Sequence, residues 1–201
     1  VLIVITAPIM LIAMIAIKLD SPGPVLYKQE RITKNQREFN ILKFRSMSVT
    51  AEQDSGPVLA TSNDSRVTKV GRTIRSLRID ELPQLFNVLK GDMSLVGPRP
   101  ERPFFVNQFK EANPYYSLRH NVRAGITGYA QVYGKYSTDF NSKLNFDLLY
   151  IKNYSLSFDF KLLFQTVKIL FDKVSSRGVD EEEQEIQTDW TDFEDKLIII
   201  E

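Results

Sequence analysis

An uncharged run at the start of the chain constrains the fold most. Residues 1–17 carry no charged side chain, and the first charge is Lys18. A helix that crosses a bilayer needs about 20 apolar residues, and Pro8 removes a helix hydrogen bond and favours a kink. The run is apolar all round, so it lacks the polar face of a surface helix. A buried core helix is the alternative. We expect a membrane helix over residues 1–19, cut at its start, that either re-enters at the proline kink or spans the bilayer.

The remaining charge divides into a basic body and an acidic tail. The 201 residues have a net charge of +1. Residues 175–201 hold ten acids and two bases, which leaves 24 bases against 15 acids in residues 1–174. A basic body favours phosphates, nucleic acid or an anionic membrane face as partners. The absence of cysteine excludes disulfides and thiolate nucleophiles and fits a cytoplasmic setting.

Hydrophobic periodicity predicts an α+β domain over residues 20–174 that is mostly helical with a small β element. Residues 25–29 and 39–44 have strand patterns. Helices are predicted at 66–77, 80–90, 101–119, 138–153 and 157–173. The segments 48–65 and 122–136 are predicted as loops, and 175–201 as a solvated tail. The broad apolar face of 157–173 suits either a membrane surface or core packing.

Two adjacent carboxylates, Asp80 and Glu81, lie between arginines and an apolar helix pattern that ends at Gly91. Acids at a helix start are usually caps or partners of the helix dipole. Carboxylates among fixed cations, however, are also what a protein needs to hold and attack a phosphate ester. Successive helical residues point about 100° apart, so the two acids are expected to have different roles.

Cations flank these acids in two further motifs. Arg99 lies between Pro98 and Pro100, which stiffen the turn that presents it. Strand alternation places Lys43 and Arg45 on one face. A solvated surface turn and surface salt bridges are the alternative interpretations of these two motifs.

Aromatic residues near the end of the body suggest a nucleobase contact. Tyr129, Tyr133 and Tyr136 could stack on a base and Gln131 could hydrogen-bond it, although tyrosines packed in the core are the commoner case. The single histidine, His120, has no visible partner triad and is interpreted as structural.

Together these motifs resemble the bacterial sugar transferase family, the monotopic polyprenyl-phosphate phosphoglycosyl transferases. The match extends over most of residues 1–175, as in the catalytic C-terminal part of a larger member. It includes Lys18–Val25, Gln29 with Arg31, Lys43–Met47, the unbroken stretch Asp80–Pro100, and Gly125–Gly128 with Ala130–Val132.

The resemblance implies transfer of a phosphosugar from a UDP-sugar to polyprenyl (undecaprenyl) phosphate, with release of UMP. Asp80 would be the nucleophile that forms an aspartyl–phosphosugar intermediate, and Glu81 would assist as base or metal partner. Mg²⁺ would be the cofactor, with Asp80 and Glu81 as its ligands. The expected phosphate and substrate contacts are Arg31, Lys43, Arg45, Arg78, Arg99 and Gln131.

The implied setting is the bacterial inner membrane, with the catalytic domain facing the cytoplasm and Pro8 as the breakpoint of a re-entrant helix. The lipid bilayer is therefore an expected partner, and pairing with a second copy of the chain is left open. Two other functions remain: a sugar-only glycosyltransferase that releases UDP, and a non-catalytic membrane scaffold for polysaccharide assembly. Nucleic-acid binding is not expected, because no known motif is present and the bases lie beside carboxylates.

Overall fold

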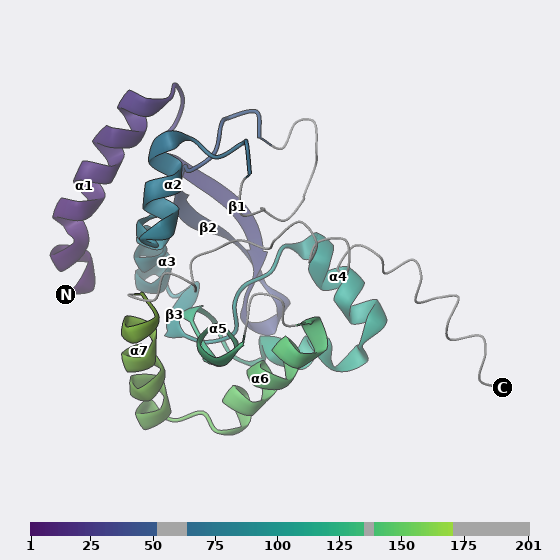
Figure 1. Cartoon of the computed structure of the whole chain (residues 1–201). Helices are drawn as coiled ribbons and strands as arrows, with labels where there is room; N and C mark the ends of the chain where they lie inside the picture. Colours follow the sequence, from purple (N-terminus) through teal and green to yellow (C-terminus); the bar gives the residue numbers. More distant parts are fainter. Residues whose placement is uncertain (52–63, 135–138, 171–201) are drawn as a thin grey trace.

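The computed structural model describes residues 1–51, 64–134 and 139–170. The helices and strands of these residues confirm a mostly helical α+β fold (Figure 1). The helices are α1 (Leu2–Asp20), α2 (Lys69–Ser76), α3 (Gln84–Lys90), α4 (Pro103–Ala112), α5 (Tyr129–Tyr133), α6 (Phe140–Lys152) and α7 (Leu156–Leu170). Three 3₁₀ turns are η1 (Lys34–Gln36), η2 (Ile79–Glu81) and η3 (Pro114–Asn121). The strands are β1 (Leu26–Ile32), β2 (Glu38–Phe44), β3 (Met93–Val96) and β4 (Ala124–Thr127).

The strands of the described residues form two small sheets. β1 and β2 pair antiparallel, as their alternating patterns predict, and Lys43 lies opposite Tyr27. β3 and β4 pair in parallel, with Met93 opposite Ala124. The prediction of a loop over 122–136 was therefore wrong, since that segment contains β4 and the short helix α5. The glycine at 125 has a packing reason, because a Cβ there would collide with the Gly97 backbone.

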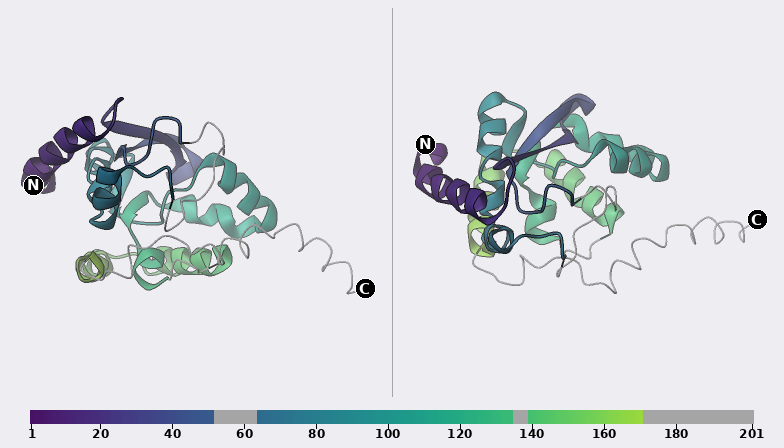
Figure 2. Two further views of the ribbon diagram at one scale, coloured as in Figure 1. Left: turned by 45° about the horizontal axis from the view of Figure 1, so that its top comes forward. Right: turned by 90° about the horizontal axis from the view of Figure 1, so that it is seen from above.

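Helix α1 lies alongside α2 and touches the body through one narrow face (Figures 1 and 2). Met10, Ala13 and Ile17 are buried against Phe44 and Ile74. Most other apolar side chains of α1 are exposed, and only 17% of its most apolar stretch of 18 residues is buried. A helix of 19 residues with mean hydropathy 2.5 is long and apolar enough to cross a membrane. Pro8 lies inside this helix, and a re-entrant path is not confirmed.

The junction between α1 and the body is held by polar contacts. The Asp20 carboxylate accepts from the Val70 N–H at the start of α2 (3.3 Å). The Ser21 N–H closes the last turn of α1 on the Ile17 carbonyl (3.3 Å). These bonds satisfy main-chain groups at helix ends, which otherwise have no partner within a helix.

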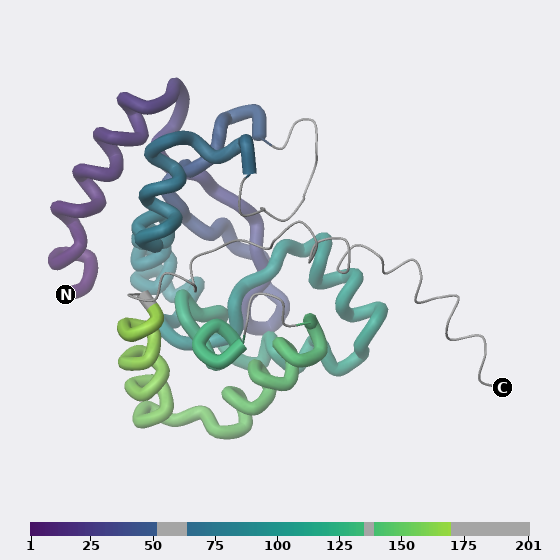
Figure 3. Tube along the Cα trace, viewed as in Figure 1, coloured from purple at the N-terminus to yellow at the C-terminus, as the bar shows by residue number. Residues whose placement is uncertain are grey.

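Several of the described helices gather on one side of the molecule. α1, α2, α3 and α7 lie on the left in every view, and the chain trace shows α7 below α3 (Figures 2 and 3). In α7, Leu162 is buried, whereas Phe160, Phe164 and Val167 are exposed. The apolar face predicted for 157–173 therefore does not pack wholly into the core. The predicted acidic tail, 175–201, lies outside the described residues.

Candidate active site

A buried asparagine aligns the strand and the helix that carry the site. Asn87 of α3 is 1% exposed. Its side-chain oxygen accepts from the Leu42 N–H (2.9 Å), and its nitrogen donates to the Asn40 carbonyl (2.8 Å). Both bonds satisfy main-chain groups of β2, which α3 thereby holds in fixed register. Lys43, at the end of that strand, is placed beside the turn that precedes α3.

Asp80 and Glu81 lie on the 3₁₀ turn η2, not in the first turn of one helix over 80–90 as predicted. Residues Gln84–Lys90 alone form α3, and Gly91 ends it with a φ of 84°, as the sequence indicated. The turn begins at Arg78, whose φ of 56° is in the left-handed region. A non-glycine residue held there is strained, and such strain occurs often at functional sites.

Glu81 is the centre of a charged cluster that we call the Glu81 cluster: Lys43, Glu81 and Arg99. The Lys43 ammonium lies 3.3 Å from Glu81 Oε1, and Arg99 Nη2 donates to the same oxygen at 3.1 Å. The Glu81 side chain is 12% exposed. Burial raises its pKa, but the positive charges of Arg99, Lys43 and Arg78 outweigh that effect and lower the pKa well below the usual range. Glu81 is therefore ionised at neutral pH.

Asp80 has a different environment from its neighbour. Among the described residues its carboxylate makes no hydrogen bond and no ion pair, although Lys43, Arg75 and Arg78 act on it at longer range. Burial first, and then the charge of Glu81, raise the pKa of Asp80 to about 6. A half-buried carboxylate of raised pKa with both oxygens uncommitted is basic enough to attack an electrophile.

The turn that carries Arg99 is clamped by its neighbours. The Gly97 N–H donates to the Thr127 carbonyl (2.9 Å), and the Gly125 N–H to the Pro98 carbonyl (3.0 Å). A Cβ at Gly97 would collide with the Arg123 carbonyl, so only glycine permits this approach. These contacts hold the main chain of the turn, whereas the Arg99 side chain is 42% exposed.

Arg31 and Arg78 also border the cluster. Arg31 donates to the Pro100 carbonyl (3.1 Å) and pairs with Glu101 (3.4 Å) and Gln29 (2.6 Å). Its buried Nε has no partner among the described residues. Burial first, and after it the charges of Arg99 and Arg31, lower the pKa of Lys43. The charge of Arg78 opposes the rise in the pKa of Asp80 and contributes to the lowering of the pKa of Glu81. The structure thus brings six of the predicted residues, four cations and two acids from distant segments, into one electrostatic site.

Arg45 lies elsewhere. It is 6% exposed, and its guanidinium donates to main-chain carbonyls at the end of α1: Ser21 (2.7 Å), Pro22 (2.6 Å) and Ile17 (3.5 Å). Strand alternation no longer applies to it, because β2 ends at Phe44. Arg45 therefore joins the end of α1 to the body of the domain. Contact of Arg45 with a substrate stays a prediction.

The residues predicted to contact a nucleobase have different environments. Tyr129 packs against the rings of Tyr133, Phe146 and Phe158, which is the core arrangement. Tyr133 is 44% exposed, and Tyr136 lies outside the described residues. Both amide atoms of Gln131 are buried without a partner in the described part of the chain. An uncommitted buried amide is costly, so Gln131 is the better candidate for a polar substrate contact.

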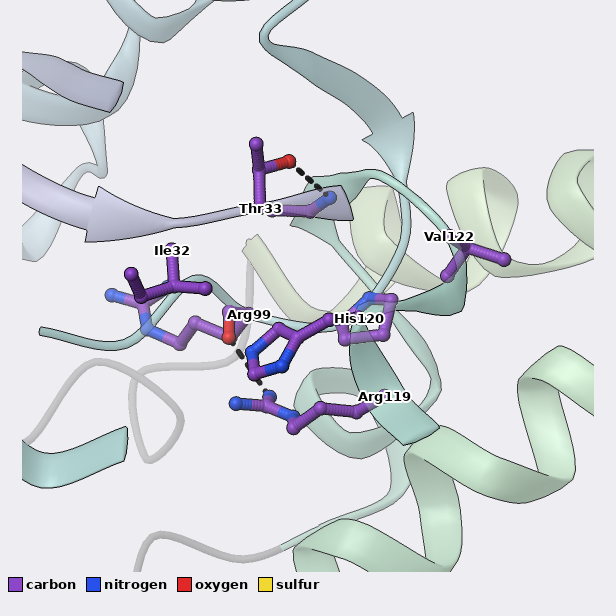
Figure 4. A pocket seen from close by; sticks show the side chains of 8 residues that line it. Ile32, Thr33, Arg99, Arg119, His120 and Val122 are labelled. Atoms are coloured by element: carbon purple, nitrogen blue, oxygen red, sulfur yellow. Dashed lines mark hydrogen bonds between the residues drawn. The ribbon is translucent and has the colours of Figure 1, made fainter. Parts of the chain in front are cut away.

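A small cavity lies behind the Arg99 turn (Figure 4). Its volume is about 10 Å³, which is room for about one water molecule. His120 borders it, and burial and then the charge of Arg119 lower the pKa of His120 to about 4. The histidine is therefore neutral and buried, in agreement with a structural role.

Sequence reasoning missed the buried pair of Arg119 and Asp147. Arg119 donates to Asp147 Oδ2 from Nε (2.9 Å) and Nη2 (2.7 Å). The two side chains are 5% and 2% exposed. They are 28 positions apart and belong to no motif, so only an unusual charge within the apolar pattern of 138–153 could have indicated Asp147.

Comparison with known proteins identifies the family of this chain. The sequence profile of the bacterial sugar transferase family matches residues 1–173, and the chain belongs to that family. One relative is the UDP-N-acetylgalactosamine-undecaprenyl-phosphate N-acetylgalactosaminephosphotransferase of Aeromonas hydrophila. It is 50% identical over 174 residues, which cover 85% of this chain and 41% of the relative.

Two further relatives carry a different sugar in their names. The UDP-glucose:undecaprenyl-phosphate glucose-1-phosphate transferase of Klebsiella pneumoniae is 43% identical, over 83% of this chain and 37% of its own length. The enzyme of the same name from Caulobacter vibrioides is 43% identical, over 82% of this chain and 63% of its own length. The chain thus spans about two fifths of the Aeromonas and Klebsiella proteins.

Proposed function

We propose that this chain is the catalytic part of a phosphoglycosyl transferase that moves a sugar 1-phosphate from a UDP-sugar to undecaprenyl phosphate. The observation that carries the proposal is the contrast between adjacent acids: Asp80 is uncommitted with a raised pKa, while Glu81 is held ionised by Lys43 and Arg99. The names of the relatives support the donor and acceptor classes.

The reaction proceeds in two displacements. A carboxylate oxygen of Asp80 attacks the β-phosphorus of the UDP-sugar, the bridging P–O bond breaks, and UMP leaves. An oxygen of undecaprenyl phosphate then attacks the phosphorus of the aspartyl–phosphosugar and releases the Asp80 carboxylate. The product is an undecaprenyl diphosphosugar. Covalent catalysis of this kind divides one difficult step into two easier ones.

The cations and Glu81 have supporting roles. Arg99 and Lys43, both paired with Glu81, can neutralise the negative charge that develops on the phosphoryl oxygens and on leaving UMP. Arg31 and Arg78 extend the positive field toward the entering diphosphate. Glu81 holds Lys43 and Arg99 in place and, as a fixed negative charge, keeps Asp80 basic.

The residues present fit a Mg²⁺ ion. Mg²⁺ in such sites is held by one or two carboxylates together with substrate phosphates. No group of three or more acids or histidines suited to a metal occurs in the described ranges, so the phosphates must supply most ligands. Asp80 and Glu81 would be the protein groups that hold such an ion. When bound, the ion neutralises charge on the diphosphate and orients it.

The exposed apolar faces support a membrane setting. In α1, Val4, Ile5 and Ile12 are more than 60% exposed. Helix α7, which lies on the same side of the molecule as α1 (Figure 2), exposes Phe160 and Phe164. We place this side in the cytoplasmic leaflet of the bacterial inner membrane. Pro8 is then the breakpoint of a re-entrant helix, which keeps the Glu81 cluster in the cytoplasm beside the lipid phosphate.

The test is product identity. With undecaprenyl phosphate in detergent and a panel of UDP-hexoses and UDP-N-acetylhexosamines, we expect UMP, not UDP, from at least one donor, measured by ion-pair chromatography. Release of UDP would instead indicate a sugar-only glycosyltransferase. Restoration of polymer synthesis in cells by an Asp80→Ala, Glu81→Ala double variant would indicate a scaffold.

A further inference from the structure

The turn that presents Arg99 is held through its carbonyls. Four consecutive carbonyl oxygens, from residue 98 to residue 101, accept a hydrogen bond from another segment. The pairs are Gly125 N–H to Pro98 (3.0 Å), Arg119 Nη2 to Arg99 (2.9 Å), Arg31 Nη1 to Pro100 (3.1 Å) and Ile32 N–H to Glu101 (3.0 Å).

Arg119 differs from the other donors because its side chain is enclosed. Asp147 accepts two of its N–H groups, and its Nη1 donates to the Tyr116 hydroxyl at 2.7 Å. A guanidinium is planar and its donors are fixed relative to one another. Once Asp147 sets that plane, Nη2 points at the Arg99 carbonyl, and Figure 4 shows this bond.

Stability alone does not explain why this ion pair is buried. Replacement of a buried ion pair by apolar residues of similar volume is often neutral or stabilising. A buried pair can instead impose one geometry, and here the group that it contacts is the main chain of Arg99 itself. The side chain of that same residue reaches Glu81.

We propose that Arg119 is a positioning residue: held by Asp147, it fixes the Arg99 carbonyl and thereby directs the Arg99 guanidinium to Glu81 and to the substrate diphosphate. The effect on rate rests on the proposed phosphoglycosyl transfer. The effect on the Arg99 side chain does not, and it can be measured separately.

The test compares two variants with a control. Arg119→Lys keeps a cation beside Asp147 but cannot span Asp147 and the Arg99 carbonyl together. The double variant Arg119→Met, Asp147→Leu removes both buried charges, so no unpaired charge prevents folding. Tyr116→Phe is the control, because it removes one Arg119 hydrogen bond and leaves the bond to Arg99. Thermal unfolding of each variant is recorded first.

We expect kcat for UMP release to fall about 10- to 100-fold in both Arg119 variants, with KM for the UDP-sugar changed less than about threefold. Tyr116→Phe should stay within about twofold of the wild type. In an Arg99→Ala background the Arg119 changes should have no further effect on kcat, because the group that they position is absent. Wild-type kcat in both Arg119 variants, or an equal loss with and without Arg99, would overturn the proposal.

A readout without turnover separates this proposal from the proposed function. Arg119→Lys should increase the rate at which phenylglyoxal modifies Arg99, followed by peptide mass spectrometry, because Arg99 leaves Glu81 more often. An unchanged rate would refute the positioning role. If the wild type releases no UMP from any donor, the proposed function fails, and this labelling experiment still decides the role of Arg119.

Discussion

Two clusters of ion pairs contact Arg99, one at its carbonyl and one at its guanidinium, and they differ in how completely they are closed. Arg119 and Asp147 are enclosed, and the Arg119 guanidinium has protein partners on each side. In the Glu81 cluster, Arg99 remains 42% exposed, and the neighbouring Asp80 has no hydrogen bond or ion pair in the described part of the chain. A closed cluster has little left to offer a ligand, whereas the open one retains charge for a substrate.

The two clusters also differ in what they act on: one holds the main chain, and the other sets the pKa values of two acids. The closed cluster contacts main chain and holds a turn in place. The open cluster raises the pKa of one acid to about 6 and lowers that of the next. Pairs of titratable groups whose environments drive their pKa values apart are typical of acid, base or nucleophile assignments. The following changes test this contrast, from the largest expected effect to the smallest.

Asp80→Asn should have the largest effect. We expect UMP release to fall at least about 10³-fold, because the amide is not a nucleophile. The same variant should be more stable than the wild type at pH 7–8, by roughly 1–3 kcal/mol. The folded-state pKa of Asp80, about 6, exceeds the ordinary value of 3.8 that applies to the unfolded chain. The wild type therefore loses stability as the pH rises from the lower to the higher of these two pKa values, because Asp80 then ionises less readily in the folded state than in the unfolded state. A less stable, inactive protein would contradict this account of Asp80.

Arg99→Ala should reduce kcat about 10²- to 10³-fold, as expected when one preorganised donor to a developing negative charge is removed. It should also raise the pKa of Glu81, since Arg99 is the strongest of the charges that lower it. Steady-state kinetics with Arg72→Ala, at an exposed position of α2, as the surface control measures the first effect. Equal losses in the two variants would show that general charge, and not the Glu81 contact, matters.

Glu81→Gln should reduce kcat about 10²-fold and change the pH profile. For the wild type we expect kcat/KM to fall below pH about 6, because Asp80 becomes protonated. Burial is the main cause of the raised pKa and the Glu81 charge the next, so removal of that charge should move the acid limb to lower pH. An acid limb that stays in place, or moves upward, would contradict the coupling between the two acids.

Gln131→Ala should increase KM for the UDP-sugar about tenfold with little change in kcat, since one polar contact contributes roughly 1.4 kcal/mol. Its buried amide has no protein partner in the described ranges, so the loss should not destabilise the fold. Initial rates over a range of donor concentrations decide the point. A lower melting temperature with an unchanged KM would assign Gln131 to packing.

Arg45→Met should have the smallest effect on the intrinsic rate. We expect kcat per folded molecule within about threefold of the wild type and a stability loss of about 2–4 kcal/mol. Arg45 satisfies the Ser21 and Pro22 carbonyls at the end of α1 and lies apart from the Glu81 cluster. Lys43→Met is the matched comparison. It should show a large loss of kcat and a smaller loss of stability than Arg45→Met. A large increase in KM for Arg45→Met would restore its predicted substrate contact.

Much of the fold follows from local patterns. The strands β1 and β2, the helices α2, α6 and α7, and the C-terminal glycine of α3 were predicted because alternation, helical spacing and glycine preference act over a few residues. The strands β3 and β4 were missed, since each has only four residues and their partners are about 30 positions apart. Parallel pairing at that distance depends on packing that no local pattern shows.

The site was partly predictable for the same reason. Asp80, Glu81 and Arg99 lie within 20 positions of one another, and the motif context identified them as candidates. Their unequal roles became specific through contacts from other segments, above all Lys43 on Glu81. Arg45 shows the limit of the pattern, because alternation fails where β2 ends. Arg119 carries no local signal, and Asp147 carries only that of a charge within an apolar helix pattern, so only the tertiary fold brings the two together.

The most direct test of the central claim is capture of the covalent intermediate. The protein is incubated with Mg²⁺ and an active UDP-sugar donor but without undecaprenyl phosphate, quenched in acid, and digested for mass spectrometry. We predict a sugar-phosphate adduct on Asp80, formed with about one UMP per protein and lost when undecaprenyl phosphate is added. An active enzyme that releases UMP only in the presence of the acceptor, with Asp80 unmodified, would contradict the account.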